Sequence, residues 1–246
     1  MVRIKVRTTR KASFLWGALL PLLVLLAACK PQNAANPLPR GPTPSEVIRL
    51  AVWPDEDTRW RVCESTWEEF AKGGYVGEDV TAAALRYTLP APLEGVRGEL
   101  RLFWPLASVV QECGDLALRG LRPFRPSNRP PVMVHQPLLA YWGPEKPPKD
   151  WQAQLVLLDG HGDRVGYLPS SPFRGGDCLL GSCSGEITFW VAYPSQDLTQ
   201  VQPSLEGSFF LDALDKQDVK GLRLEVYWGD LGTDMVLDLG GLHGAP

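Results

Sequence analysis

The amino-acid sequence predicts a mainly β fold, with a sandwich-like C-terminal half and a smaller α+β N-terminal part. Short segments of alternating apolar and polar residues recur after residue 150 and are separated by turn residues, which is typical of a β sandwich. The 23 prolines and 24 glycines among 246 residues indicate many short connections rather than a helical bundle. The clearest helical spacing lies in the N-terminal part, which is therefore expected to mix helix and strand.

The first predicted elements of the folded part are a strand and a helix. Residues 47–53 (VIRLAVW) alternate between apolar and polar side chains, which predicts a strand. Over residues 57–72 the apolar residues recur at helical spacing, with Asp57 or Thr58 as a cap and Gly73-Gly74 as a stop. Residues 79–89 fit either a helix or a strand, and residues 98–104 predict a strand. The pattern in residues 105–118 is ambiguous between the two.

Prolines are dense in residues 122–149, and they predict either an interdomain connector or a long wrapped loop. Any strand in this segment is expected at the edge of a sheet. Beyond residue 150 the chain is expected to be almost wholly β, with a hairpin turn at residues 159–163 (DGHGD), where glycines supply positive φ. Strands are predicted over 152–158, 164–168, 186–193, 207–213, 222–228 and 235–239. A single continuous domain that uses strands from both halves is the alternative to two separate regions.

Four cysteines after residue 29 predict two disulfides in an oxidising compartment. The close pair Cys178 and Cys183 most simply closes its own small loop, which leaves Cys63 with Cys113. Crossed pairing, free buried thiols and a metal site are the alternatives. A metal site is disfavoured because the sequence contains neither a Cys-x-x-Cys motif nor a Cys/His cluster.

The N-terminus carries the signature of an export signal. An apolar stretch over residues 14–28 follows five basic residues and no acidic one: Arg3, Lys5, Arg7, Arg10 and Lys11. The stretch is shorter than the roughly 20 residues that a transmembrane helix needs. These features predict a segment that is removed during export rather than one that spans a membrane.

The apolar stretch ends in Leu26-Ala27-Ala28-Cys29, which resembles the lipobox of bacterial lipoprotein precursors. The resemblance implies that residues 1–28 are a signal peptide, cleaved before Cys29, and that the Cys29 thiol carries a diacylglycerol. Two or three acyl chains anchor a protein to a membrane stably. The resemblance further implies that Lys30 permits sorting to the outer membrane where two membranes are present. The alternative is an ordinary secretory signal with cleavage after an A-x-A-like site.

The mature chain is expected to have four parts. They are the lipidated cysteine and a flexible tether over 29–45, an α+β region over 46–121, the connector over 122–149 and a β-sandwich-like region over 150–246. Removal of the five basic residues of the signal changes the formal net charge from -3 to -8. Such a chain has no footprint for nucleic acid, so no nucleic-acid partner is expected.

A few side chains are candidates for chemistry or binding. Trp142, beside Tyr141 in the proline-rich segment, is predicted to be exposed, and the pair forms a candidate ligand-binding site. Trp190 and Trp228 lie in alternating segments and are expected in the core. Cys183 stands in a G-x-C-x-G pattern, but a nucleophile elbow needs a strand before it and a helix after it. Asp159, His161 and Asp163 are weak candidates for a metal site, with a plain hairpin turn as the simpler interpretation.

The sequence favours an envelope protein without enzymatic activity, which binds another protein or contributes to a surface assembly. No Walker or dinucleotide-binding motif occurs, and no cofactor is expected. Binding of glycans or small apolar ligands through exposed aromatic rings is the first alternative. A hydrolase that uses carboxylates or Cys183 is the second.

Overall fold

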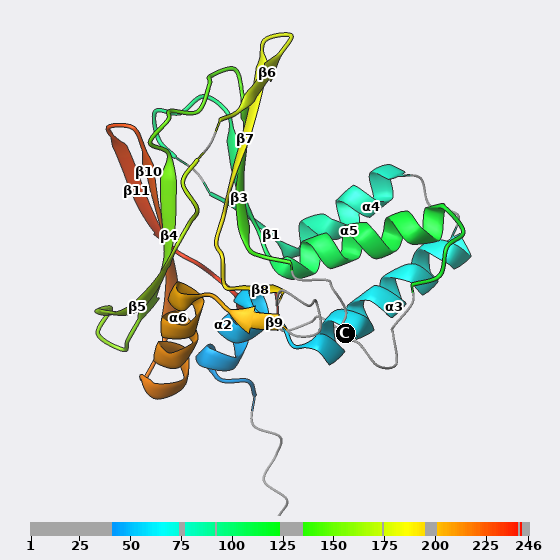
Figure 1. Ribbon diagram of the computed structural model, residues 1–246, viewed down its shortest axis with the longest axis horizontal. Helices are drawn as coiled ribbons and strands as arrows, with labels where there is room; N and C mark the ends of the chain where they lie inside the picture. Colours follow the sequence, from blue (N-terminus) through cyan, green and yellow to red (C-terminus); the bar gives the residue numbers. More distant parts are fainter. Residues whose placement is uncertain are drawn as a thin grey trace, which may run out of the picture. The chain divides into compact units, whose positions relative to one another are not determined.

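Two antiparallel sheets face each other across the core (Figure 1). The computed structural model describes residues 41–73, 77–91, 93–123, 135–173, 175–194, 201–240 and 242. Residues 42–246 form one compact unit. The predicted signal peptide, Cys29 and most of the predicted tether lie outside the described residues.

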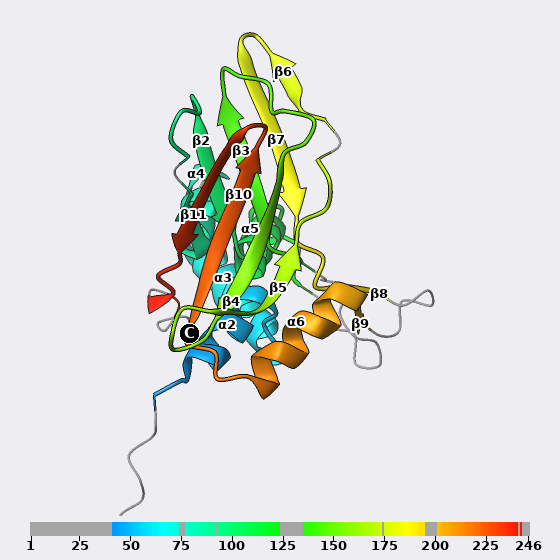
Figure 2. The same ribbon diagram turned by 90° about the vertical axis from the view of Figure 1, so that its left-hand side faces the viewer.

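The first sheet, here called sheet A, has the strand order β1-β2-β3-β7-β6. Its strands are β1 (Thr88–Pro90), β2 (Glu99–Phe103), β3 (Leu138–Gly143), β6 (Asp177–Leu179) and β7 (Ser182–Thr188). The second, sheet B, has the order β11-β10-β4-β5 and lies in front of sheet A in Figure 2. Its strands are β4 (Gln152–Leu158), β5 (Arg164–Pro169), β10 (Gly221–Trp228) and β11 (Leu231–Val236). A small pair, β8 (Ala192–Pro194) and β9 (Val201–Pro203), stands apart from both.

Five α-helices are described around the sheets. They are α2 (Pro44–Val52), α3 (Glu56–Gly73), α4 (Gly77–Ala84), α5 (Pro105–Leu118) and α6 (Leu205–Lys216), with a short 3-10 helix η1 (Leu85–Tyr87) after α4. The helices α4 and α5 lie beyond sheet A, on the side away from sheet B (Figure 1). None of the described helices is both long and apolar enough to cross a membrane. The predicted fold class is confirmed, because the C-terminal half is mostly strands in antiparallel sheets and the N-terminal part mixes helices with strands.

The core fills the space between the inner faces of the two sheets and continues among the helices α2, α3 and α5. Tyr141 of sheet A meets Trp228 of sheet B with ring centroids 4.8 Å apart, and Trp228 meets Trp151 at 5.1 Å. Trp228 is buried, as predicted. Aromatic rings of this size remove a large apolar area from water, so the contact between the sheets contributes strongly to stability.

Two predicted strands are helices. Residues 47–52 belong to α2 and Trp53 is its C-cap, because Thr43 and Glu46 form a capping box and Pro44 occupies the first turn. Residues 207–213 belong to α6, because the Ser204 hydroxyl accepts a hydrogen bond from the Gly207 amide at 2.8 Å. In both segments the buried residues follow helical spacing, so tertiary packing reinforces the caps.

Other predictions needed smaller corrections. Residues 105–118, whose secondary structure was ambiguous from the sequence, form the helix α5. The predicted strand over 186–193 ends at Thr188. Trp190 follows that strand and is 50% exposed, so its predicted place in the core was wrong. The strand β3 lies between β2 and β7 rather than at a sheet edge, because no proline falls within Leu138–Gly143.

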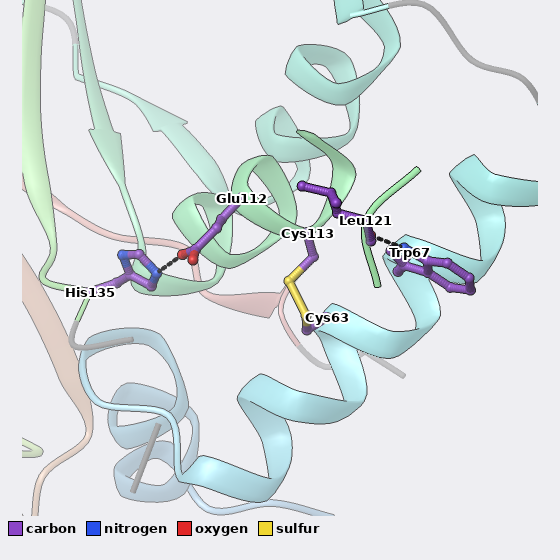
Figure 3. Close-up of a disulfide and its surroundings, with 6 residues drawn as sticks. All are labelled: Cys63, Trp67, Glu112, Cys113, Leu121 and His135. Carbon is purple, nitrogen blue, oxygen red and sulfur yellow. Dashed lines mark hydrogen bonds and ion pairs between the residues drawn. A yellow bond between two sulfur atoms is a disulfide. The ribbon is translucent and has the colours of Figure 1, made fainter. Parts of the chain in front are cut away.

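Both predicted disulfides are present. Cys63 of α3 is bonded to Cys113 of α5 in the core, and Cys178 is bonded to Cys183 across the β6–β7 hairpin. Figure 3 shows the first disulfide between the two helices, with the Trp67 indole donating to the Leu121 carbonyl at 2.8 Å nearby. Two disulfides indicate an oxidising, extracytoplasmic compartment.

Candidate functional site

A groove of about 460 Å³ lies where the outer face of sheet A meets α4, η1 and α5. Its volume falls within the range of about 300–1,000 Å³ that is typical of ligand sites. The groove is mainly apolar, with a few charged and amide groups. Its lining residues are Thr81, Ala84, Leu85, Glu99, Arg101, Phe103, Ala107, Ser108, Gln111, Leu138, Ala140, Trp142 and Glu186.

Strand β3 forms the floor of the groove. Leu138, Ala140 and Trp142 alternate along this strand with the fully buried Leu139 and Tyr141, so their side chains share the outer face of the sheet. The four residue steps from Leu138 to Trp142 span about 13 Å, which sets the length of the floor. Because β3 is an inner strand, both long sides of the floor carry side chains from a neighbouring strand.

The strand register places opposite charges on the two sides of the floor. Ala140 pairs with Arg101 of β2 on one side and with Glu186 of β7 on the other. Adjacent strands lie about 4.8 Å apart, so the backbones at Arg101 and Glu186 are separated by about 10 Å. Between the two charged groups, the small Ala140 side chain is buried at 5% exposure.

The two charged sides differ in their pairing. The Arg101 guanidinium donates hydrogen bonds to the carboxylate of Glu99, which lies two residues away on the same face of β2. Among the described residues, no basic group lies within ion-pair distance of Glu186. Within the described part of the chain, the groove therefore carries one uncompensated negative charge on the β7 side.

Two helices form the wall of the groove, and a glycine allows them to approach closely. A Cβ atom at Gly114 of α5 would lie 2.9 Å from both methyl carbons of Val80 in α4. Glycine at this position therefore lets α4 pack directly against α5. The wall presents the side chains of Ser108 and Gln111 to the groove.

The two residues that the sequence predicted for ligand binding lie on opposite faces of β3. Trp142 lines the groove, is 43% exposed and packs edge-on against Phe103 with ring centroids 5.8 Å apart. Tyr141 is fully buried, and its hydroxyl donates to the Arg97 carbonyl at 2.7 Å. Burial raises the pKa of the Tyr141 hydroxyl. Of the predicted pair, only Trp142 is therefore placed to meet a ligand.

The turn at residues 159–163, a weak candidate for a metal site, is held by hydrogen bonds to the Asp159 carboxylate. The Asp159 carboxylate accepts hydrogen bonds from the backbone amides of Asp163 at 2.9 Å and His161 at 2.8 Å. These two bonds hold the pKa of Asp159 below its ordinary value. Within the described parts of the chain, no group of three or more His, Cys, Asp or Glu side chains is arranged to hold a metal ion.

The tip of the β6–β7 hairpin is a second unusual surface, which the sequence analysis did not identify. Leu179 and Leu180 are 74% and 99% exposed, and the bond between Cys178 and Cys183 closes the strands beneath them. The hairpin extends beyond the neighbouring strands of sheet A (Figure 1). Two adjacent leucines between closely spaced cysteines were the available signal. Since Cys183 is bonded, its sulfur has no thiolate to act as a nucleophile.

Comparisons with protein-family models, with curated protein sequences and with solved structures found no match to this chain.

Proposed function

We propose that this chain is a lipid-anchored envelope protein that acts by binding a partner protein at the groove rather than by catalysis. The lipobox-like sequence ending at Cys29 supports the anchor, and the two disulfides support an extracytoplasmic location. Where the envelope has two membranes, Lys30 favours the outer one. The tether over residues 29–45 would hold the folded part away from the lipid surface.

The open groove beside Trp142 is the observation that carries the binding proposal. An exposed aromatic ring next to an aliphatic floor, with charged groups along both sides, is the composition expected of a protein-binding surface. The ionisable side chains that line it are the Glu99–Arg101 pair and Glu186. These charged side chains can orient a bound segment and attract its charged groups.

Site-specific crosslinking in living cells tests this function. A photoreactive amino acid at Gln111, on the groove wall, is expected to capture the same envelope protein in repeated experiments. The matched control is the same amino acid at Tyr167, which is exposed on β5 of the other sheet. Capture of nothing at Gln111, or of the same proteins at both positions, would count against the proposal.

The membrane anchor has its own test. Intact mass of the detergent-extracted protein is expected to show an N-terminal, lipid-modified Cys29, together with a gain of four protons on reduction of the two disulfides. A Cys29→Ala variant is expected to leave the membrane fraction. An unmodified N-terminus on the membrane-associated protein would overturn the anchor.

Glycan or small-ligand binding at the same groove is a second candidate. Trp142 offers a ring face for stacking, and Gln111 and Arg101 offer hydrogen-bond donors. Tryptophan fluorescence, titrated with cell-wall fragments and polysaccharides, is expected to change in the parent protein. Trp142→Phe, which keeps an aromatic ring, should bind without that change in signal, while Trp142→Ala should lose binding. An unchanged signal with every glycan would exclude this candidate.

A further inference from the structure

We infer that the groove recognises a protein segment in which an apolar side chain stands next to a lysine or arginine. The inference rests on the proposed function, because it specifies the chemistry of the partner at the same site. It is carried by the juxtaposition of the apolar β3 floor and the carboxylate of Glu186, which has no ion-pair partner among the residues that the structure describes.

The floor determines the apolar part of the segment. Leu138 and Ala140 are aliphatic, and Phe103 and Trp142 close one side of this surface with their edge-to-face contact. A surface of this kind gains most from an aliphatic or aromatic side chain, because burial removes apolar area from water on both partners. A sugar ring, with its hydroxyl groups, would leave polar atoms facing Leu138 without partners.

The charges determine the second part of the segment. The charge of Arg101 is already neutralised by Glu99, so it offers little attraction to an anion. Glu186 stands one strand from Ala140, about 4.8 Å across the floor, and carries the net negative charge of the groove. A lysine or arginine beside the apolar side chain can reach this carboxylate while its neighbour covers the floor.

The net charge of the whole mature chain also favours a cationic segment. Its formal net charge of -8, after loss of the signal, attracts cationic segments over longer distances and repels anionic ones. Phosphate groups of lipids or nucleic acids are therefore poor candidates for the groove. A cationic, partly apolar peptide satisfies both the local and the overall charge.

Selection from a displayed library of random peptides tests the inference. The target is the full-length protein, extracted in detergent and immobilised with both disulfides intact. We expect the selected peptides to share an apolar residue within one or two positions of a lysine or arginine. Their affinity should fall about tenfold on Glu186→Lys, because the attraction becomes a repulsion. Glu186→Gln should have a smaller effect.

A matched variant controls for general charge effects. Asp234→Lys makes the same change of charge on an exposed position of β11, on the other sheet, and is expected to leave peptide affinity unchanged. Intact mass before and after reduction confirms that each variant keeps both disulfides. Equal weakening by Glu186→Lys and Asp234→Lys would assign the effect to overall charge and overturn the inference.

The remaining outcomes separate this inference from the proposed function. If selected peptides lack basic residues but lose binding on Trp142→Ala, the groove binds proteins and only the inferred charge preference is wrong. If peptides bind Trp142→Ala as well as they bind the parent protein, both the inferred charge preference and the proposed binding at the groove are wrong. A library that yields no binder, with a polysaccharide that changes Trp142 fluorescence, would replace the peptide with a glycan.

Discussion

Cys63 and Cys113 join the buried sides of α3 and α5, with their Cα atoms 5.3 Å apart, and close a loop of 50 residues. The chain-entropy estimate for a loop of this length is a stabilisation of about 4 kcal/mol. The double variant Cys63→Ser/Cys113→Ser is therefore expected to lower the free energy of unfolding by about that amount, measured by urea denaturation. The much smaller loop closed by Cys178 and Cys183 should contribute about 2 kcal/mol. Equal losses of unfolding free energy in this variant and in Cys178→Ser/Cys183→Ser would contradict this ranking.

Tyr141 and Trp142 should separate stability from binding. Tyr141→Phe removes the hydroxyl that donates to the Arg97 carbonyl and accepts from the Glu145 amide, and should lower the unfolding free energy by about 1–3 kcal/mol. Trp142→Ala, at an exposed position, should have a smaller effect on unfolding and should abolish groove binding. Urea denaturation of both variants, beside the crosslinking experiment, provides the comparison. A stable Tyr141→Phe protein would contradict the structural role.

Glu225 on the outer face of sheet B should make stability depend on pH. Burial alone raises the pKa of this carboxyl, but hydrogen bonds from Gln154, Tyr227 and Arg223, together with the charge of Arg223, outweigh it and lower the pKa. The stabilisation is therefore complete above the ordinary glutamate pKa of about 4.3 and is lost as pH falls through the lower folded-state pKa. Comparison of unfolding free energy between the parent and Glu225→Gln should show a difference that shrinks in this acidic range. A constant difference down to pH 2 would contradict it.

Leu180 should be replaceable by glycine without loss of stability. Its φ of 51° lies in the left-handed region, which costs a leucine about 1–2 kcal/mol, and its side chain is 99% exposed. Leu180→Gly is therefore expected to keep or raise the thermal midpoint of unfolding. Leu168→Gly, at a fully buried position of β5, is the contrasting control and should unfold the protein. A clear loss of stability in Leu180→Gly would show that this side chain has a partner within the fold.

Local signals explain which elements could be predicted. The helical spacing over residues 57–72 predicted α3, and the structure confirms a helix over Glu56–Gly73. In α2 the same apolar residues satisfy both an alternating pattern and helical burial, so the capping pair Thr43 and Glu46 was the decisive signal. The strand predicted over 207–213 is the helix α6, in which Phe210 is buried and its neighbour Phe209 is exposed.

The groove could be predicted only in part. Exposure of Trp142 follows from its proline-rich surroundings, and the structure agrees. The position of Arg101 and Glu186 on either side of Ala140 depends on the order β2-β3-β7, which pairs strands from distant parts of the chain. No pattern within a short stretch of sequence encodes that pairing.

The chain alternates between the two sheets, and this order limits how the protein can fold. After β3 has entered sheet A, β4 and β5 form part of sheet B, β6 and β7 return to sheet A, and β10 completes the centre of sheet B. Leu155 of β4 pairs with Leu224 of β10, which follows it by 69 residues. High contact order of this kind slows folding relative to helical proteins of similar size. During synthesis or export, one edge of β4 therefore stays unpaired until β10 has emerged, and over that interval the nascent chain is open to aggregation and proteolysis.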